Sequence, residues 1–560
     1  MTAMVYDSWG SPADRFHGAM CLGIDLGTTN SCVGIWHVER NHVKMLKNRS
    51  DRGRTMPSVV HFDPQSQHVD VGNAAVEFET VPPVGNTIRS IKRLLGRKFV
   101  SKAVDVARIY ASYSVVPTAQ GNVGLRVVRG GKKVQVQPEE IAASILAELK
   151  ASAEAYFDGR INFNNVVITV PAYFSDSQRK ATLTSASMAG FQIVRLLNEP
   201  TAAAMAYGLF LSGTKLVTVF DFGGGTLDVS LLRIEDGKFE VLGIGGDTNL
   251  GGDDINNVLV DHLIEVLDRH HNVTRAQVED LDLVKIKREV EKAKIILSEE
   301  EFAVITVDIA DVPAITYTLT RCKFEQLCDP IWKKCLRIVS GVLEEAKVEL
   351  SDVDEVILVG GSTRIPILRQ QISDAFSGKE LCMSVNADEV VCEGAAIQAA
   401  ILCGVDQRVF RDVLMMDVLP LPIGLETADG SMEVILPKNA RIPTSVTKYF
   451  QTYEDNQRGL TVEVYEGENE VAKECDHICY FNFALPRDKI GKAGEFAHPV
   501  TFTMNANGIL QVKAGLHHDD HEEAPMSKTA VYLMIGYALA LFGLYVFFRI
   551  YFTEERGVTA

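Results

Sequence analysis

The sequence predicts a two-lobed α/β domain, then an antiparallel β-sandwich domain, and then a single C-terminal transmembrane helix. Three observations support this order. Residues 20–411 alternate strand-like runs such as "NVVITVPAYF" with helix-like stretches such as "PEEIAASILAELKASAEAYF", a pattern typical of an α/β domain. Residues 418–515 carry short alternating runs separated by Gly, Pro and Asn, as antiparallel β domains do. Residues 530–552 are apolar apart from Arg549.

The overall composition is that of a globular protein. The 560 residues are 23% charged and 46% hydrophobic, which allows several domain-sized units. A net charge of -17 argues against sequence-independent nucleic-acid binding, because neutralising phosphates requires a surplus of Lys and Arg. Ten cysteines without a CxxC pair indicate reduced thiols. Residues 1–19 lack the apolar core of a signal peptide and are predicted to be a flexible extension.

A repeated hairpin carries the clearest chemical signal in the α/β domain. Both "LGIDLGTTNSCVGIW" and "VTVFDFGGGTLDVSLL" contain an apolar strand that ends in Asp, a Gly/Thr turn and a returning strand. Glycines let backbone N–H groups approach phosphate oxygens, and the Asp can hold a hydrated Mg²⁺. Two such hairpins predict a nucleotide site between two duplicated lobes. Neither matches a Walker loop or a dinucleotide fingerprint.

Further motifs make a specific resemblance. In order along the chain, "GIDLGTTNSCVG", "NTIRSIKRLLGRKF", "VITVPAYFSDSQRKAT", "LLNEPTAAAMAYGL", "VFDFGGGTLDVS", "GGDTNLGGDD" and "VGGSTRIP" resemble the seventy-kilodalton heat-shock chaperones of the actin-like ATPase superfamily. The hairpins alone would also fit sugar kinases of that superfamily. "NEPTAAA" and the acidic-apolar linker "DVLMMD", residues 412–417, select the chaperone branch. The resemblance covers residues 20–514.

This resemblance implies an actin-like ATPase domain over residues 20–411 that binds ATP or ADP with Mg²⁺. It implies that Asp25 and Asp221 hold the hydrated Mg²⁺. The residues implied in catalysis, to orient the attacking water and stabilise the transferring phosphoryl group, are Lys92, Glu199, Asp228 and Thr226. The residues implied to surround the nucleotide are Gly27, Thr28, Thr29, Asn30, Gly223, Gly224, Gly225, Glu291, Lys294, Ser298, Gly361, Arg364 and Asp388. Ile295 departs from relatives in which an Arg stacks on adenine.

The resemblance also implies allosteric residues and partners. Pro171, Arg179 and Glu199 match residues that relay the nucleotide state to the linker, which ends at Asp417. Arg195 matches a position that meets J-domain co-chaperones. The implied partners are a J-domain co-chaperone, a nucleotide exchange factor and unfolded polypeptide clients, with no nucleic acid.

The β domain, residues 418–515, is expected to clamp an extended peptide in a side-chain pocket. The residues that match this pocket and its arch are Leu425, Thr427, Ala428, Phe450, Tyr453, Leu460 and Val462. From alternation alone, the apolar pocket positions would be core residues. The domain departs from its relatives because Pro422 falls in the expected first strand, the segment 473–494 lacks their turn pattern, and the last strand and the helical lid are not recognisable.

The tail is expected to anchor the protein in a membrane. The nineteen uncharged residues Ala530–Phe548 would span about 28 Å as a helix, enough to cross a bilayer. A buried core helix is the alternative, but no domain follows that could bury it. Residues 516–529 are a polar spacer in which "HHDDHEEA" is interpreted as solvated chain rather than a metal site. Residues 553–560 are a short tail, which predicts a tail anchor in the lipid bilayer.

The leading hypothesis is a membrane-anchored ATP-driven chaperone with its ATPase domain in the cytosol. Because Lys528 and Arg549 flank the span almost symmetrically, the charges do not select an organelle. The endoplasmic reticulum is slightly favoured over the mitochondrial outer membrane. A nucleotide-gated membrane adaptor that recruits co-chaperones without clamping peptide is the alternative, and a metabolite kinase is disfavoured by the linker.

Overall fold

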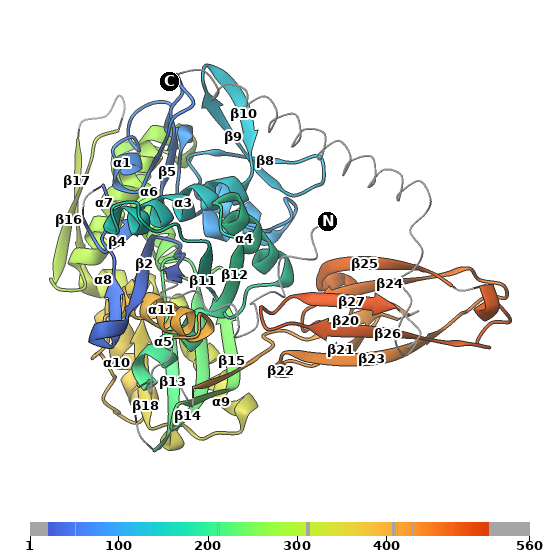
Figure 1. The fold of residues 1–560 in the computed structure, drawn as a ribbon. Coiled ribbons are helices and arrows are strands. Elements are labelled where there is room, and N and C mark those ends of the chain that lie inside the picture. Colours follow the sequence, from blue (N-terminus) through green and yellow to red (C-terminus); the bar gives the residue numbers. More distant parts are fainter. Residues whose placement is uncertain are drawn as a thin grey trace, which may run out of the picture.

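The computed structural model describes residues 21–514 except 51, 210, 212, 310–313, 406–409, 411–412, 428 and 486. This part of the chain forms a two-lobed α/β domain and a β-sandwich that extends away from it (Figure 1), so the predicted α/β fold is confirmed. The predicted N-terminal extension, spacer, transmembrane helix and short tail lie outside the described residues. Among the helices that are described, none has the length and apolar character needed to cross a membrane.

Lobe I is built on a mixed sheet in the order β12-β11-β1-β2-β3, with β4 also pairing with β2. Its strands are β1 (Leu22–Asp25), β2 (Asn30–His37), β3 (His42–Met45), β4 (Thr55–Pro57), β11 (Asn165–Val170) and β12 (Ile193–Asn198). Two small sheets complete the lobe, with strands β5 (Val60–Phe62), β6 (Val69–Val71), β7 (Thr87–Ile88), β8 (Ser114–Pro117), β9 (Val123–Arg129) and β10 (Lys132–Val136). Its helices are α1 (Asn73–Val76), α2 (Lys102–Tyr110), α3 (Pro138–Tyr156) and α4 (Asp176–Met188).

Lobe II repeats the central arrangement in a sheet of order β18-β13-β14-β15-β19-β22. Its strands are β13 (Thr214–Phe222), β14 (Leu227–Glu235), β15 (Lys238–Asp247), β18 (Glu355–Val359), β19 (Leu414–Val418) and β22 (Arg441–Ile442), with a separate hairpin of β16 (Phe302–Val307) and β17 (Ile315–Thr320). Its helices are α6 (Gly252–His271), α7 (Asp280–Ile296), α8 (Arg321–Leu327), α9 (Asp329–Ala346) and α10 (Pro366–Ala375).

The two sheets share one topology. In each, a first strand pairs antiparallel with the next strand along the chain and parallel with a later one: β1 with β2 and β11, and β13 with β14 and β18. Helices α5 (Glu199–Gly208) and α11 (Val390–Leu402) pack on each other, and an apolar cluster that includes both helices joins Val167 of β11 to Val217 of β13. This shared core sets the two hairpins at the same end of their sheets.

The β domain is a sandwich of a four-stranded and a three-stranded antiparallel sheet, in the orders β21-β20-β24-β25 and β23-β26-β27. Its strands are β20 (Ile423–Glu426), β21 (Met432–Leu436), β23 (Thr444–Gln451), β24 (Gly459–Glu466), β25 (Asp476–Ala484), β26 (Ala497–Met504) and β27 (Leu510–Ala514). Along β26, buried residues alternate with more exposed ones, and Val500 and Phe502 join Val462 and Val464 in the core between the sheets.

Pro422 does not lie in the first strand of this domain, so that expectation was wrong. β20 begins one residue later, at Ile423. Proline has no N–H to donate to a sheet, and the Pro422 carbonyl instead accepts a hydrogen bond from the Gly467 N–H at 3.1 Å.

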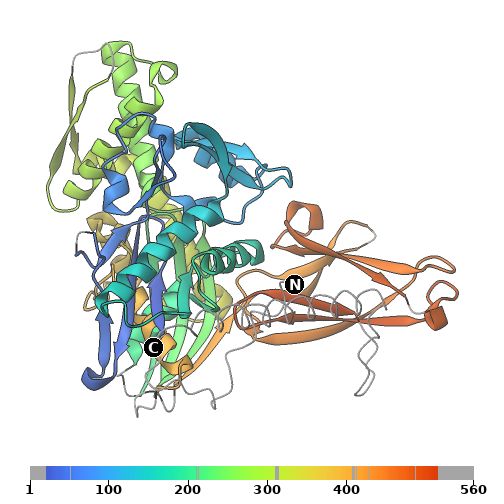
Figure 2. The same ribbon diagram turned by 45° about the horizontal axis from the view of Figure 1, so that its top comes forward.

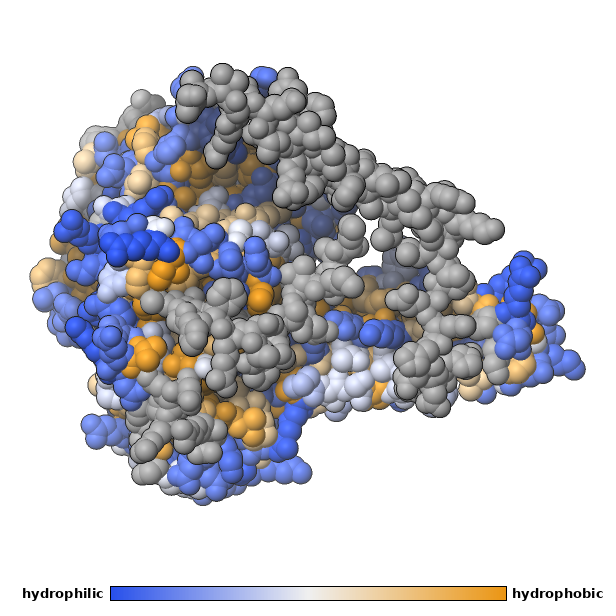
Figure 3. Space-filling view, in the orientation of Figure 1, coloured by the Kyte–Doolittle hydropathy of each residue, from blue (hydrophilic) through white to orange (hydrophobic). Residues whose placement is uncertain are grey.

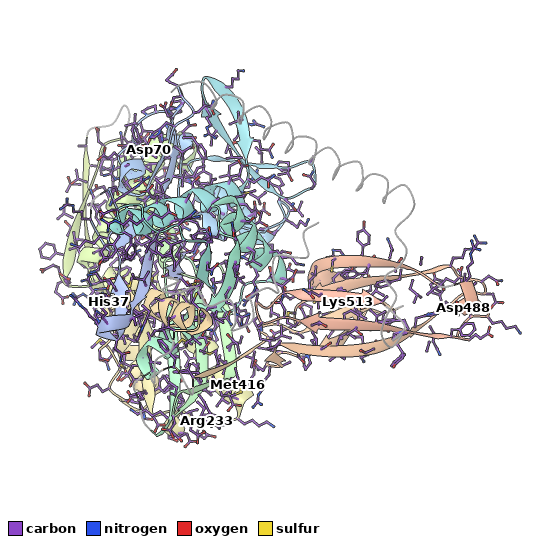
Figure 4. The ribbon with its side chains drawn as sticks, in the orientation of Figure 1. His37, Asp70, Arg233, Met416, Asp488 and Lys513 are labelled. Atoms are coloured by element: carbon purple, nitrogen blue, oxygen red, sulfur yellow. The ribbon has the colours of Figure 1, made fainter. Side chains whose placement is uncertain are left out.

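Four of the six residues of the predicted linker, 414–417, lie in strand β19, which joins the two domains. β19 pairs parallel with β15 and antiparallel with β22, where the β domain begins to fold back. Turning the molecule shows the sandwich attached at one end only (Figure 2). Met416 of β19 therefore lies beside the α/β domain, whereas Asp488 is at the far end of the sandwich (Figure 4). Hydrophilic and hydrophobic residues are mixed on the visible face of the α/β domain (Figure 3). The far end of the sandwich is largely hydrophilic.

Candidate nucleotide-binding site

A cavity of about 600 Å³ opens between the two lobes and is lined from both hairpins. All residues predicted to be catalytic, nucleotide-binding or metal-binding line it, except Gly225 and Asp228. Asp228 lies next to the cavity, because it pairs in register with Asp221 across β13 and β14. The structure therefore brings these residues together from positions that are far apart in the chain.

The hairpins approach each other so closely that Gly224 and Gly225 have no room for a side chain. A Cβ atom on Gly224 would lie 1.9 Å from Thr29 Oγ1, and one on Gly225 would lie 2.5 Å from Thr28 Oγ1. Within the first hairpin, a Cβ on Gly27 would lie 2.0 Å from the Asn30 carbonyl oxygen. Such bare turns leave backbone N–H groups accessible, which is the arrangement that cradles phosphate oxygens.

Three buried carboxylates, Glu199, Asp221 and Asp228, gather at this end of the cavity with the partly exposed carboxylate of Asp25. Burial, opposed by the Lys92 cation and reinforced by Asp25 and Asp228, raises the pKa of Glu199 to about 8. Burial raises the pKa of Asp228 to about 6, and burial with the neighbouring carboxylates raises that of Asp221. Crowded carboxylates of this kind favour a bound cation, which would lower these pKa values again.

The donor set fits a hydrated Mg²⁺. Asp25 and Asp221 come from equivalent strand ends of the two lobes and both line the cavity. Asp25 Oδ1 accepts from Thr169 Oγ1 at 2.8 Å, which fixes the carboxylate. Asp228 Oδ2 is buried and has no hydrogen-bond partner within the part of the chain that the structure describes, so it can accept from a water beside the ion site. Carboxylate oxygens with water are the ligands that Mg²⁺ prefers.

Lys92 is the cation of this cluster. It is 5% exposed, and its Nζ donates to Glu199 Oε1 at 2.5 Å. The ammonium also lies 5.7 Å from the centre of the Phe174 ring. A buried charge requires a partner of this kind, so Lys92 and Glu199 hold each other in place at the wall of the cavity.

The other end of the cavity collects the residues predicted to surround the nucleoside. Arg364 Nη2 donates to Asp388 Oδ2 at 2.5 Å, and Lys294 Nζ donates to the Gly252 carbonyl at 3.1 Å. Ile295 lines the same region with 61% of its surface exposed. The predicted residues that also line the cavity here are Glu291, Ser298 and Gly361.

Several cavity residues were not predicted. Ser362 donates from Oγ to the Gly223 carbonyl at 2.9 Å and so joins the third glycine motif to the second hairpin. Gly360 has φ +82°, and a Cβ there would lie 2.4 Å from the Phe222 carbonyl oxygen. Both belong to "VGGSTRIP", and Gly252 and Asp253 belong to "GGDTNLGGDD". These motifs support the resemblance, and their glycines alone could have assigned these residues to the site.

Comparison with known proteins agrees with this geometry. A family model described as "Hsp70 protein" matches residues 21–531. The chain is 42% identical to "Heat shock 70 kDa protein" of Neurospora crassa over 504 residues, 89% of this chain and 76% of that relative. It is 40% identical to "Heat shock cognate 70 kDa protein 3" of Dictyostelium discoideum over 500 residues, 88% of this chain and 78% of that relative. The chain belongs to the Hsp70 family. The predicted family is confirmed, and since Hsp70 proteins are ATPases and chaperones, so is this chain.

In this Hsp70, the predicted allosteric residues lie in one hydrogen-bonded network that is partly buried. Arg179 donates from Nη2 to the Asn198 side-chain oxygen at 2.9 Å and to the Ala172 carbonyl at 3.0 Å. Asn198 Nδ2 in turn donates to Asp417 Oδ2 of the linker strand at 2.8 Å. Pro171 directly follows strand β11. Its carbonyl accepts a hydrogen bond from the Phe174 N–H at 3.1 Å.

The same network extends into the β domain through Asn507. Asn507 Oδ1 accepts from Arg195 Nη1 at 3.1 Å and from the Leu196 N–H at 3.0 Å, and its carbonyl accepts from Arg179 Nη1 at 3.4 Å. Asn507 was not among the predicted residues. It follows a strand of the second domain, and no local pattern links it to residues more than 300 positions earlier.

The residues predicted for the peptide pocket are placed mostly inside the sandwich. Leu425 and Val462 belong to its core, Phe450 packs against that core, and Leu460 is 7% exposed. Thr427 Oγ1 bonds to the Asp429 side chain at 2.5 Å. Of the two predicted arch residues, Tyr453 is 78% exposed and Ala428 lies outside the described residues.

Proposed function

We propose that this Hsp70 is a membrane-anchored chaperone that couples ATP hydrolysis in the inter-lobe cleft to binding and release of unfolded polypeptide segments by its β domain. One observation carries the proposal: a continuous set of contacts leads from Glu199 in the cleft, through its neighbour Asn198, to Asp417 of the linker and, through Arg179, to Asn507 of the β domain. A change at the cleft can reach the peptide-binding domain along this path.

In the cleft, each group has a task that its position supports. The bare glycine turns of the two hairpins bind the phosphates, and the Thr226 backbone closes the second turn by accepting from the Gly223 N–H at 3.1 Å. Asp25 and Asp221 would hold Mg²⁺ through water, and the ion supplies charge neutralisation on the phosphates when bound. Lys92 and Glu199 orient the attacking water, and Asp228 accepts from it.

Coupling follows from the contacts of the linker strand. Because Asp417 accepts from Asn198 and from Thr201 Oγ1 at 3.3 Å, movement of α5 in response to nucleotide would release or hold β19. Release would free the sandwich from the α/β domain and change its grip on a client. A J-domain co-chaperone at Arg195 and a nucleotide exchange factor are the partners that family membership implies.

Membrane anchoring rests on the sequence of the tail. Nineteen uncharged residues, Ala530–Phe548, suffice to cross a bilayer. We place the ATPase domain in the cytosol, with the endoplasmic reticulum as the first membrane to examine. A fluorescent protein fused to residues 516–560 and imaged in cells tests this placement, and a diffuse signal would exclude the anchor.

Single-turnover ATP hydrolysis tests the coupling. The full-length chain in detergent is mixed with ATP in the presence and absence of a J-domain protein and of an extended apolar peptide. We expect both additions to accelerate hydrolysis. We expect Asn507→Ala to abolish the acceleration by peptide. A peptide of the same length in which Glu replaces the apolar residues serves as the matched control. Hydrolysis that responds to neither addition would exclude the chaperone cycle.

The placement of the pocket residues favours a second candidate, a nucleotide-gated membrane adaptor. Leu425 and Val462 lie in the sandwich core, where a peptide side chain cannot displace them without repacking. An adaptor would hydrolyse ATP faster with a J-domain protein but would not respond to peptide, so the same experiment separates the two functions.

A further inference from the structure

A second cavity, of about 120 Å³, lies between the lobes beside the nucleotide cavity. Its lobe I wall comes from the segment after β7 and from the end of α2, and its lobe II wall comes from α6 and α7. The residues that line both cavities are Thr28, Thr29, Asp253 and Glu291. Because Thr28 and Thr29 belong to the first hairpin, the two cavities meet at its phosphate turn.

The second cavity carries more positive than negative side chains. Its cations are Arg89, Arg93, Lys287 and Arg288, and its carboxylates are Glu79, Asp253 and Glu291. The carboxylates already have donors or cations beside them: Glu79 accepts from Arg89, Asp253 Oδ2 accepts from Ser90 Oγ at 2.7 Å, and Glu291 Oε2 lies 3.9 Å from Arg89 Nη1. Four cations facing three carboxylates leave a net positive charge, in a chain whose overall charge is -17.

Lys287 is the cation of this cavity that is least compensated. Its Nζ donates to the Tyr110 carbonyl of lobe I at 2.6 Å, and no carboxylate of the described chain forms an ion pair with it. Lys292 of the same helix, by contrast, pairs with Glu289 at 2.6 Å. Burial, reinforced by neighbouring arginines and opposed by Asp253, lowers the pKa of Lys287 to about 8. An anion in the cavity would stabilise the charged form.

Two buried polar atoms on residues that line this cavity have no hydrogen-bond partner within the described part of the chain. The Arg93 side chain is 10% exposed, and one of these atoms is its Nε. The other is Oδ1 of Asn256, which is 7% exposed. The first atom is a donor and the second is an acceptor. A ligand that both accepts and donates hydrogen bonds would satisfy them together.

We propose that the second cavity binds orthophosphate, the product of ATP hydrolysis, after it leaves the nucleotide cavity. Near neutral pH, orthophosphate carries negative charge and at least one O–H group. It can therefore accept from Arg93 and Lys287 and donate to Asn256 Oδ1. A cavity of this size holds several waters, which is room for one tetrahedral oxyanion. Sulfate has a similar shape and charge but no O–H group, so it cannot supply the donor.

Bound phosphate would also connect the two lobes. It would lie between Arg93 of lobe I and Lys287 of lobe II, and the nucleotide cavity lies between the same lobes. An anion that holds the lobes together opposes the opening through which ADP leaves. Phosphate in this cavity is therefore expected to slow ADP release, and bound ADP to favour phosphate binding.

Equilibrium dialysis with radiolabelled inorganic phosphate tests the binding. The full-length chain in detergent is first saturated with Mg²⁺ and a non-hydrolysable ATP analogue, whose γ-phosphate fills the nucleotide cavity. We expect a single phosphate to bind per chain at millimolar concentration, and sulfate to compete less well than unlabelled phosphate. Absence of bound phosphate, or equal competition by the two anions, would contradict the proposal.

Variants of two lysines on α7 locate the bound phosphate. Lys287→Met keeps the apolar stem but removes the charge, and it should weaken phosphate binding roughly tenfold, as expected for one charged hydrogen bond. Lys287→Arg should retain binding. Lys292→Met, at an exposed lysine that does not line the cavity, is the matched control. Wild-type affinity in Lys287→Met, or an equal loss in Lys292→Met, would place the phosphate elsewhere and overturn the assignment.

Single-turnover kinetics separate phosphate made by the protein from phosphate taken up from solution. ATP cleavage is followed by chemical quench, and release of phosphate by a fluorescent phosphate-binding sensor. In the wild-type chain, release should lag behind cleavage. Lys287→Met should shorten this lag roughly tenfold, in line with its weaker binding, at an unchanged rate of cleavage. A lag that does not change in this variant would show that the product does not pass through the second cavity, and the proposal would be wrong.

Discussion

At the scale of single residues, the buried ion pair of Lys92 and Glu199 is the part of the cleft most sensitive to substitution. Lys92→Ala removes the ammonium that lowers the pKa of Glu199, so the carboxyl keeps its proton even beside a bound cation and no longer orients water. We expect single-turnover hydrolysis to fall by at least about a hundredfold, while the hairpins still bind nucleotide. Lys98→Ala, at an exposed lysine that donates to Asn122, is the control. A wild-type rate in Lys92→Ala would contradict the assigned role.

Ile295 should set how long the nucleotide stays bound. It lies at the mouth of the cavity with a large exposed fraction, and the neighbouring Ile296 does not line the cavity. An arginine in place of Ile295 could stack on the base, and such exposed contacts contribute about 0.5–1 kcal/mol. Ile295→Arg should therefore slow release of a fluorescent ADP two- to fivefold, roughly, in stopped-flow measurements. Ile296→Arg should leave the rate unchanged, and an equal effect of both would indicate a general charge effect.

At the scale of elements, the linker strand β19 is held to the α/β domain by its pairing with β15 and by the side chain of Asp417. Asp417→Ala removes the acceptor for Asn198 and Thr201 and leaves those donors buried, which costs about 1–3 kcal/mol. We expect faster backbone hydrogen exchange in Leu414–Val418 and faster cleavage of the linker by protease. Leu414→Ala, at a half-exposed residue of the same strand, should have little effect. Equal protection in Asp417→Ala and wild type would contradict this anchoring role.

Elements whose residues are neighbours in the chain could be predicted from the sequence, whereas contacts between distant residues could not. The hairpins were predictable because the strand, its terminal Asp and the glycine turn are neighbours in the chain, as in the stretch around Asp25. The contact between Asn507 and Arg195 was not predictable, because no sequence feature near either residue indicates that the two are in contact. Pro422 was misplaced by one residue, because alternation does not define where a strand begins. Periodicity alone also did not separate core residues such as Val462 from pocket residues.

At the scale of the whole molecule, two carboxylates meet where the sandwich docks on α4. Glu466 of β24 is 4% exposed, and its Oε2 accepts from the Asp176 N–H at 3.1 Å. Asp176 Oδ1 accepts from the Leu510 N–H of β27 at 2.9 Å, and Lys180 binds its other oxygen. The charged groups that face Glu466 are Asp176, Arg179 and Asp476. Burial, with Asp176, raises the pKa of Glu466 to about 8 in this docked arrangement.

This shift makes docking of the two domains pH-dependent. Undocked, Glu466 titrates near its ordinary pKa of 4.5, so between that pH and about 8 the docked form holds an extra proton. Docking is therefore favoured at the acidic end and weakens by up to roughly tenfold per pH unit as the pH rises towards 8. Burial raises the pKa of Asp417 as well, in the same direction.

Energy transfer between a dye on each domain, measured from pH 6 to 8, should show this loss of docking. Glu466→Gln, which keeps the acceptor for the Asp176 N–H, should flatten the profile, whereas Glu463→Gln, at an exposed position of the same strand, should not. A wild-type profile in Glu466→Gln would show that Glu466 does not control docking.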